Sequence, residues 1–179
     1  KELNTERNGI TFEATNEIAH NNIINVDTLI GEYNGIQMIA QNGIAYNKIT
    51  FSLISCNNYG IYLYSDRTTY SSAYIGENTV YGGRISKGVW GVYADGIGSR
   101  LAIPTLKLYN IALESPTNGI YFKNVENGLI DYPRYAEMGS SRIVVSFNED
   151  CRNAVFNGIT QLYTSTIEKC RTKTNYHNL

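Results

Sequence analysis

Residues 57–65 read NNYGIYLYS, and this stretch decides the fold because near-copies of it recur along the chain. In it, a glycine is followed by an aliphatic residue, and tyrosines then alternate with Ile61 and Leu63. The same Gly-aliphatic-x-apolar order returns at residues 33–40 (YNGIQMIA), 88–95 (GVWGVYAD) and 116–123 (PTNGIYFK). Alternation with period two is typical of β-strands, so each copy predicts a short strand that begins beside a glycine.

Aligning the copies on their glycines produces four columns of apolar residues, at eleven and six residues before each glycine and at one and three residues after it. All sixteen positions are apolar in a chain that is 42% apolar, so the columns are not accidental. With anchors Gly35, Gly60, Gly91 and Gly119, the columns are Ile24, Ile49, Val80, Leu108; Leu29, Ile54, Ile85, Leu113; Ile36, Ile61, Val92, Ile120; and Met38, Leu63, Ala94, Phe122.

An asparagine row lies thirteen residues before the anchors, at Asn22, Asn47 and Asn78, and ends at Leu106. The segment from this row to the glycine has constant length, and all length variation falls between each glycine and the next row. A fixed unit with inserts at one place predicts a solenoid whose parallel strands stack about 4.8 Å apart. We expect the glycines at a corner that needs positive φ or a close backbone approach.

The pattern also predicts a domain division. Residues 1–132 form the solenoid, and the chain is interpreted as a fragment of a longer protein because it does not begin with Met. Counting back from Gly158 places Arg152 where the other copies have Leu or Ile. Residues 133–179, in which Ile143, Val145 and Phe147 alternate on one side, are therefore predicted to be a divergent β element that caps the solenoid or associates with partner chains.

Composition excludes several functional classes. Fifteen Lys and Arg against sixteen Asp and Glu give a net charge of −1, which argues against a nucleic-acid groove or a basic membrane patch. No apolar run approaches the roughly 20 residues of a membrane span. The three cysteines lack metal-type spacing, and no phosphate loop or zinc motif is present, so we expect no cofactor and no metal.

Residues 8–132 resemble the right-handed parallel β-helix of the pectate-lyase-like superfamily. The resemblance is carried by the stacked Gly-Ile-x-apolar strands, the asparagine row and the coils of about 25 residues. The richness in tyrosine and asparagine is similar to that of bacteriophage tailspike and appendage proteins. The resemblance implies an all-β, single-stranded right-handed parallel β-helix in a homotrimer, placed on a virion tail or secreted, with a bacterial surface polysaccharide as partner. Lyases of this fold hold calcium with outward acidic residues, where this chain has tyrosine.

Two residues after three successive anchors stand Tyr62, Tyr93 and Tyr121, which must point outward between inward neighbours. They predict a stacked aromatic ladder, on which the apolar faces of sugar rings can lie. Two other interpretations stay open: another subunit covers the ladder, or the rings only stabilise the stacked strands.

The next outward row contains Tyr64, Asp95 and Lys123, and Asp66 follows Tyr64 by two residues. Strand spacing and rise place the carboxylates of Asp66 and Asp95 about 8 Å apart, within the window of roughly 6.5–9.5 Å for an inverting glycosidase. They are the candidate catalytic residues of a polysaccharide hydrolase or lyase. The alternative is a pair of solvated turn carboxylates, with Asp95 bound to Lys123.

The two longest inserts, residues 65–77 and 95–105, leave the coil at the same corner and are expected to form one wall beside the ladder. The residues best suited to bind a ligand there are Arg67, Tyr70, Tyr74 and Arg100, because binding residues concentrate in loops on a rigid scaffold. Solvated loop side chains are the alternative. The sequence thus leaves three functions open: a polysaccharide-binding adhesin, a polysaccharide-degrading enzyme and a structural spacer.

Overall fold

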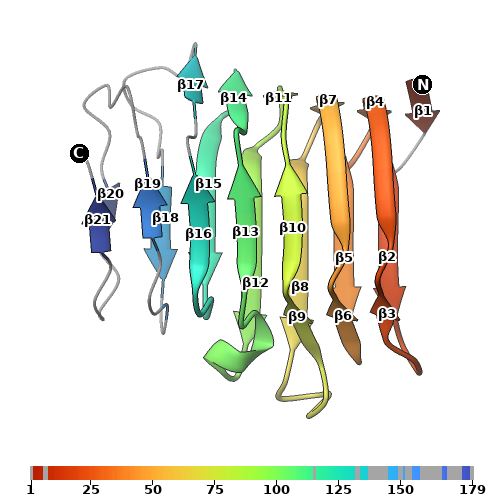
Figure 1. The fold of residues 1–179 in the computed structure, drawn as a ribbon, viewed down its shortest axis with the longest axis vertical. Coiled ribbons are helices and arrows are strands. Elements are labelled where there is room, and N and C mark those ends of the chain that lie inside the picture. Colours follow the sequence, from red (N-terminus) through yellow and green to blue (C-terminus); the bar gives the residue numbers. More distant parts are fainter. Residues whose placement is uncertain are drawn as a thin grey trace.

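Parallel strands stacked coil upon coil make up the structure in the computed structural model (Figure 1). The strands make about four turns of a β-solenoid, as the repeats predicted. In Figure 1 the coils follow one another from the N-terminus at the right to the C-terminus at the left, with one layer of strands pointing up and the layer behind it pointing down. The structure describes residues 2–5, 8–114, 116–131, 134–136, 145–148, 151, 155–157, 167–168 and 175–177.

Three parallel sheets run along the solenoid in the described residues. The first, sheet A, has eleven strands: β1 (Glu2–Thr5), β4 (Ile23–Gly31), β7 (Lys48–Cys56), β10 (Asn78–Tyr81), β11 (Arg84–Ser86), β13 (Leu106–Tyr109), β14 (Ala112–Glu114), β16 (Gly128–Asp131), β17 (Arg134–Ala136), β19 (Val155–Asn157) and β21 (Asn175–His177).

Sheet B has seven strands and carries the repeated Gly-aliphatic-x-apolar motif: β2 (Ile10–Ala14), β5 (Ile36–Ala40), β8 (Tyr59–Asp66), β12 (Trp90–Ile97), β15 (Asn118–Lys123), β18 (Val145–Asn148) and β20 (Ile167–Glu168). Sheet C is short and consists of β3 (Ala19–His20), β6 (Gly43–Ala45) and β9 (Tyr74–Gly76). A single turn of 3₁₀-helix, η1 (Arg100–Ala102), lies in the second long insert. No helix of the described residues is long and apolar enough to cross a membrane.

The four predicted apolar columns are confirmed by strand register. For example, Ile54 of β7 pairs with Leu29 and with Ile85, its equivalents one coil away on either side. All sixteen column residues are buried except Ile24, which is half-buried in the first coil of its column. Burial of one such aliphatic side chain contributes about 1.5–3 kcal/mol to the free energy of unfolding. Each side chain in a column covers its equivalents in the adjacent coils. The core is therefore a set of parallel columns along the axis.

The asparagine row forms a continuous hydrogen-bonded ladder inside the solenoid. The side-chain nitrogen of Asn22 donates to Oδ1 of Asn47 at 2.9 Å, and that of Asn47 donates to Oδ1 of Asn78 at 2.9 Å. Each acceptor oxygen also takes the backbone N–H of the preceding asparagine at 3.0 Å. The second N–H of Asn47 reaches the carbonyl of Ala19. Asn47 and Asn78 are 1% and 0% exposed, so these bonds satisfy amides that burial would otherwise leave without partners.

The corners and the glycines have separate roles. Positive φ occurs at the residue just before each member of the asparagine row, at Asn21, Tyr46 and Glu77, with values of 58°, 58° and 54°. The anchor glycines need close approach instead: a Cβ on Gly60 would lie 2.5 Å from the carbonyl oxygen of Gly91. Of the two reasons predicted for glycine, close backbone contact is the one that applies here.

Parallel pairing continues beyond residue 133. Strand β17 pairs with β14, β18 with β15 and β19 with β16. Val145 pairs with Ile120, so the register of β18 with β15 does not follow the count from Gly158. Residues 137–144 separate β17 from β18, whereas residues 115–117 separate β14 from β15, so an insert explains the interruption seen in the sequence. A capping or association role for residues 133–179 stays a prediction, because most of them, including Ile143 and Arg152, lie outside the described residues.

Replacing Gly60 with alanine tests the close-approach role. We expect Gly60→Ala to lower the free energy of unfolding by about 1–3 kcal/mol, because the new methyl group must displace a backbone carbonyl of the next coil. Urea denaturation measures the change, with Ser52→Ala at an exposed position of β7 as the control. A loss no larger than that of the control would contradict this role.

Truncating Asn47 tests the ladder. Asn47→Ala removes the acceptor of Asn22 and the donor to Ala19, and we expect it to cost about 1–3 kcal/mol of unfolding free energy. Asn22→Ala, at the exposed end of the same row, is the matched control and should cost less. Equal losses in thermal or chemical denaturation would show that burial of the ladder does not set its contribution.

Candidate functional site

Aromatic side chains gather on the outward face of sheet B, over β8, β12 and β15. Tyr62, Tyr93 and Tyr121 are in register on these three strands, as predicted, and all three are half-buried. The rings of Tyr93 and Tyr121 are stacked, with centroids 4.5 Å apart and planes 10° from parallel. The same outward row has Gln37 one coil before Tyr62 and Ser146 one coil after Tyr121. Tyrosine therefore occupies three consecutive coils of the row.

Two aromatic residues that the sequence reasoning missed complete this group. Tyr59 and Trp90 each precede an anchor glycine and are in register with one another. The Tyr59 ring stacks on Tyr62 at 5.0 Å and on Tyr93 at 4.9 Å, whereas Tyr62 and Tyr93 are 6.1 Å apart. Trp90 packs edge-on against Tyr93 and Tyr121. Their position directly before an anchor glycine was the sequence signal that could have identified them. We call the five residues Tyr59, Tyr62, Trp90, Tyr93 and Tyr121 the aromatic stack.

Stacking decides what the aromatic stack offers to a ligand. Tyr93 stacks on both Tyr59 and Tyr121, so the ring faces inside the aromatic stack are covered by neighbouring rings. Burial, and after it the negative charge of Asp95, raise the pKa of Tyr62 to about 12. Burial also raises the pKa of Tyr93, followed by the effect of Tyr121. Both phenols are neutral at physiological pH, so each hydroxyl can donate and accept a hydrogen bond.

Two more exposed tyrosines flank the aromatic stack. Tyr33, in the turn before β5, is 57% exposed, and Tyr70, in the insert after β8, is 39% exposed. Tyr33 contributes, after burial, to the raised pKa of Tyr59, and Tyr70 contributes in a smaller way to that of Tyr64, for which burial is again the main cause. Both rings are more exposed than the half-buried rings of the aromatic stack.

A partly buried ion pair lies beside the aromatic stack. Asp95 is in register with Tyr64 on one side and with Lys123 on the other, as the sequence predicted. Lys123 Nζ lies 3.4 Å from Asp95 Oδ1, and the two side chains are 20% and 19% exposed. The structure contains the predicted Lys123–Asp95 pair, but Asp95 lies within strand β12 and its Oδ1 is buried, so it is not a solvated turn carboxylate.

Asp66 closes the turn that begins the first long insert. Strand β8 stays straight to Asp66, which is in register with Ile97. The Asp66 carboxylate accepts hydrogen bonds from the backbone amides of Thr68 and Thr69 and from both threonine hydroxyls. The hydroxyl bonds chiefly, with help from the amides, lower the pKa of Asp66 to about 2. Such a carboxylate is a poor proton donor at neutral pH. Catalysis by Asp66 and Asp95 stays a prediction.

The two long inserts begin side by side, as predicted, because the amide of Arg67 donates to the carbonyl of Ile97. Both leave the solenoid at the lower edge in Figure 1. The guanidinium of Arg67 donates to the carbonyl of Ala73 and so holds its own loop. Tyr74 lies in sheet C, with its ring over Gly43, and not beside sheet B. The side chain of Arg100 lies outside the described residues.

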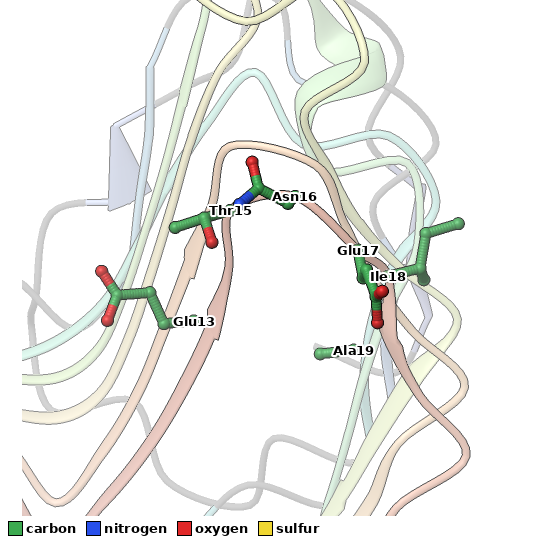
Figure 2. Close-up of a pocket in the computed structure, with 6 residues that line it drawn as sticks. All are labelled: Glu13, Thr15, Asn16, Glu17, Ile18 and Ala19. Carbon is green, nitrogen blue, oxygen red and sulfur yellow. The ribbon is translucent and has the colours of Figure 1, made fainter.

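A separate open hollow of about 380 Å³ lies at the first coil, in the turn between β2 and β3. Figure 2 shows that six consecutive or nearly consecutive residues line it: Glu13, Thr15, Asn16, Glu17, Ile18 and Ala19. They run from the end of β2 through the turn to the first residue of β3, so all of them come from one continuous segment of the chain. Among the described residues, no three His, Cys, Asp or Glu side chains are grouped closely enough to hold a metal ion.

Comparison of the chain with protein-family models, with curated proteins and with solved structures finds no match.

The Asp66 turn makes stability depend on pH. Because the pKa of Asp66 falls from 3.8 to about 2 on folding, its carboxylate stabilises the protein above about pH 4, and this contribution disappears as the pH falls toward 2. Asp66→Ala should therefore lower the urea midpoint at pH 7 and have little effect near pH 2. Asp27→Ala, at an exposed position on β4, is the control. A difference from wild type that stays constant from pH 7 to pH 2 would contradict the prediction.

Proposed function

We propose that this chain is a polysaccharide-binding β-solenoid that holds a glycan over the outward face of sheet B, across β8, β12 and β15. The observation that carries the proposal is the aromatic stack, in which three in-register tyrosines are joined by Tyr59 and Trp90 over successive coils. A surface that repeats along an axis suits a ligand that also repeats, as a polysaccharide does. A rigid solenoid keeps that spacing without ordering a loop on binding.

The chemistry of the face supports a glycan. The neutral phenols of Tyr62 and Tyr93 supply hydroxyls that both donate and accept, which matches the hydroxyl groups of sugars. The more exposed rings of Tyr33 and Tyr70 supply apolar surface beside the aromatic stack for the carbon-bound faces of sugar rings. The sugar thus meets ring faces at the flanks and hydroxyl groups in the middle.

We further propose that the solenoid is part of a phage tailspike or appendage protein that assembles as a trimer and recognises a bacterial surface polysaccharide. A rigid parallel solenoid with an aromatic outward face supports this role, as does the resemblance described for residues 8–132. Degradation of the glycan by Asp66 and Asp95 is a narrower hypothesis. The four hydrogen bonds to Asp66 favour binding over hydrolysis, because they engage that carboxylate in its own turn.

Removing only the hydroxyls tests the proposal. In the triple variant Tyr62→Phe, Tyr93→Phe and Tyr121→Phe, the stacked rings remain, so the unfolding midpoint should change little. Loss of three hydrogen bonds of about 0.5–1.5 kcal/mol each should weaken binding by about tenfold or more. Affinity for purified bacterial surface polysaccharides, selected by screening the unmodified chain on a glycan array, is measured by calorimetry.

The matched control is the pair Tyr81→Phe and Tyr109→Phe, another stacked tyrosine pair, which lies on sheet A with centroids 5.0 Å apart. It should leave glycan affinity unchanged. Absence of binding to every glycan by the unmodified chain, or full affinity in the triple variant, would reject the proposed site and leave the structural-spacer function. Release of oligosaccharides that Asp95→Asn abolishes would establish the enzyme instead.

A further inference from the structure

The charges around the aromatic stack restrict the kind of polysaccharide it can hold. Two of the cationic residues predicted for this face have side chains that the structure describes, Lys123 and Arg67. Lys123 is paired with Asp95 at 3.4 Å, and Arg67 is bound to the Ala73 carbonyl of its own loop at 3.2 Å. The charge of Lys123 is therefore balanced within the protein, and one donor of Arg67 is engaged in its own loop.

The negative groups of this face lie close to the phenols. Asp95 is in register with Tyr64 and lies two residues along the strand from Tyr93, which is in register with Tyr62. Its charge raises the pKa of Tyr59, Tyr62, Tyr64 and Tyr93 after the effect of burial, which places all four phenols within reach of its field. A sugar carboxylate or sulfate over the aromatic stack would meet an Asp95 carboxylate and a Lys123 amino group whose charges already balance each other, so this pair offers it no net attraction.

We infer that the aromatic stack is selective for uncharged polysaccharides, and that the Asp95–Lys123 ion pair is the specificity determinant that disfavours acidic ones. The inference rests on the proposed glycan-binding function and narrows its substrate class. The pair acts by mutual neutralisation: the carboxylate of Asp95 cancels the charge of the Lys123 amino group, which would otherwise attract a uronate. This discrimination costs no contact with a neutral chain.

The experiment compares two uncharged polymers, dextran and galactomannan, with two acidic polymers, polygalacturonate and alginate, alongside the surface polysaccharides found by the array. Affinities are measured between about 50 and 500 mM salt. We expect uncharged glycans to bind with affinity that is independent of salt, and acidic ones to bind about tenfold more weakly or not at all. Attraction between opposite charges would instead weaken steeply with salt, because ions screen it.

Asp95→Asn supplies the sharper test. It leaves the charge of Lys123 uncompensated, so affinity for polygalacturonate should rise by about tenfold and become sensitive to salt, whereas affinity for uncharged glycans should be retained. Glu114→Gln is the matched control, because it breaks the exposed ion pair with Arg84 at 3.2 Å on sheet A and changes the net charge equally. Thermal unfolding confirms that both variants fold.

The outcomes separate the two proposals. Salt-sensitive binding of an acidic polymer by the unmodified chain, with affinity above that for uncharged glycans, overturns the charge selectivity and keeps glycan binding. An equal gain in Asp95→Asn and Glu114→Gln also overturns it, because net charge alone would then explain the change. Binding to none of the glycans rejects the proposed function itself. If Asp95→Asn fails to fold, the salt dependence of the unmodified chain still decides.

Discussion

The constraint on which the structure depends is that equivalent residues of successive coils lie directly over one another. Parallel pairing imposes it: once Ile54 pairs with Leu29 and Ile85, every residue of those strands also meets its own equivalent. Inside, this makes columns of aliphatic side chains and a ladder of asparagines; outside, it makes a stack of aromatic rings. No coil can bury its apolar side chains alone, so stability is shared between neighbours.

The same constraint explains why the segment of constant length in each coil ends at a glycine. Where backbones of adjacent coils approach closely, a Cβ at Gly35 would lie 2.6 Å from the carbonyl oxygen of Gly60, and the steric conflict repeats at Gly60 and Gly91. The turns are built differently, with positive φ at Asn21, Tyr46 and Glu77, and the asparagine that follows holds the turn to the next coil. Inserts are tolerated after sheet B because the chain leaves the stack there.

Regular stacking also shapes the candidate site. Rings that stack on each other stabilise the strands and at the same time cover their own faces, so the aromatic stack presents hydroxyls while Tyr33 and Tyr70 present rings. Charges follow the same rule, since register brings Lys123 to Asp95. A face made from a few repeated rows thus acquires both its hydrogen-bonding character and its electrostatic character from register alone.

The sequence by itself determined the repeat: the four apolar columns, the asparagine row, the outward tyrosines and the neighbours of Asp95 all followed from counting, because in a parallel stack equal position in the repeat means contact. Only the tertiary structure decided the features that have no fixed position in the repeat. It packed Tyr59 against both Tyr62 and Tyr93, turned the Asp66 carboxylate into its own loop and placed Tyr74 on another sheet. Side-chain torsions and insert conformations have no period, so packing in three dimensions fixes them. It also placed β18 in register with β15, although the repeat in the sequence is interrupted before β18.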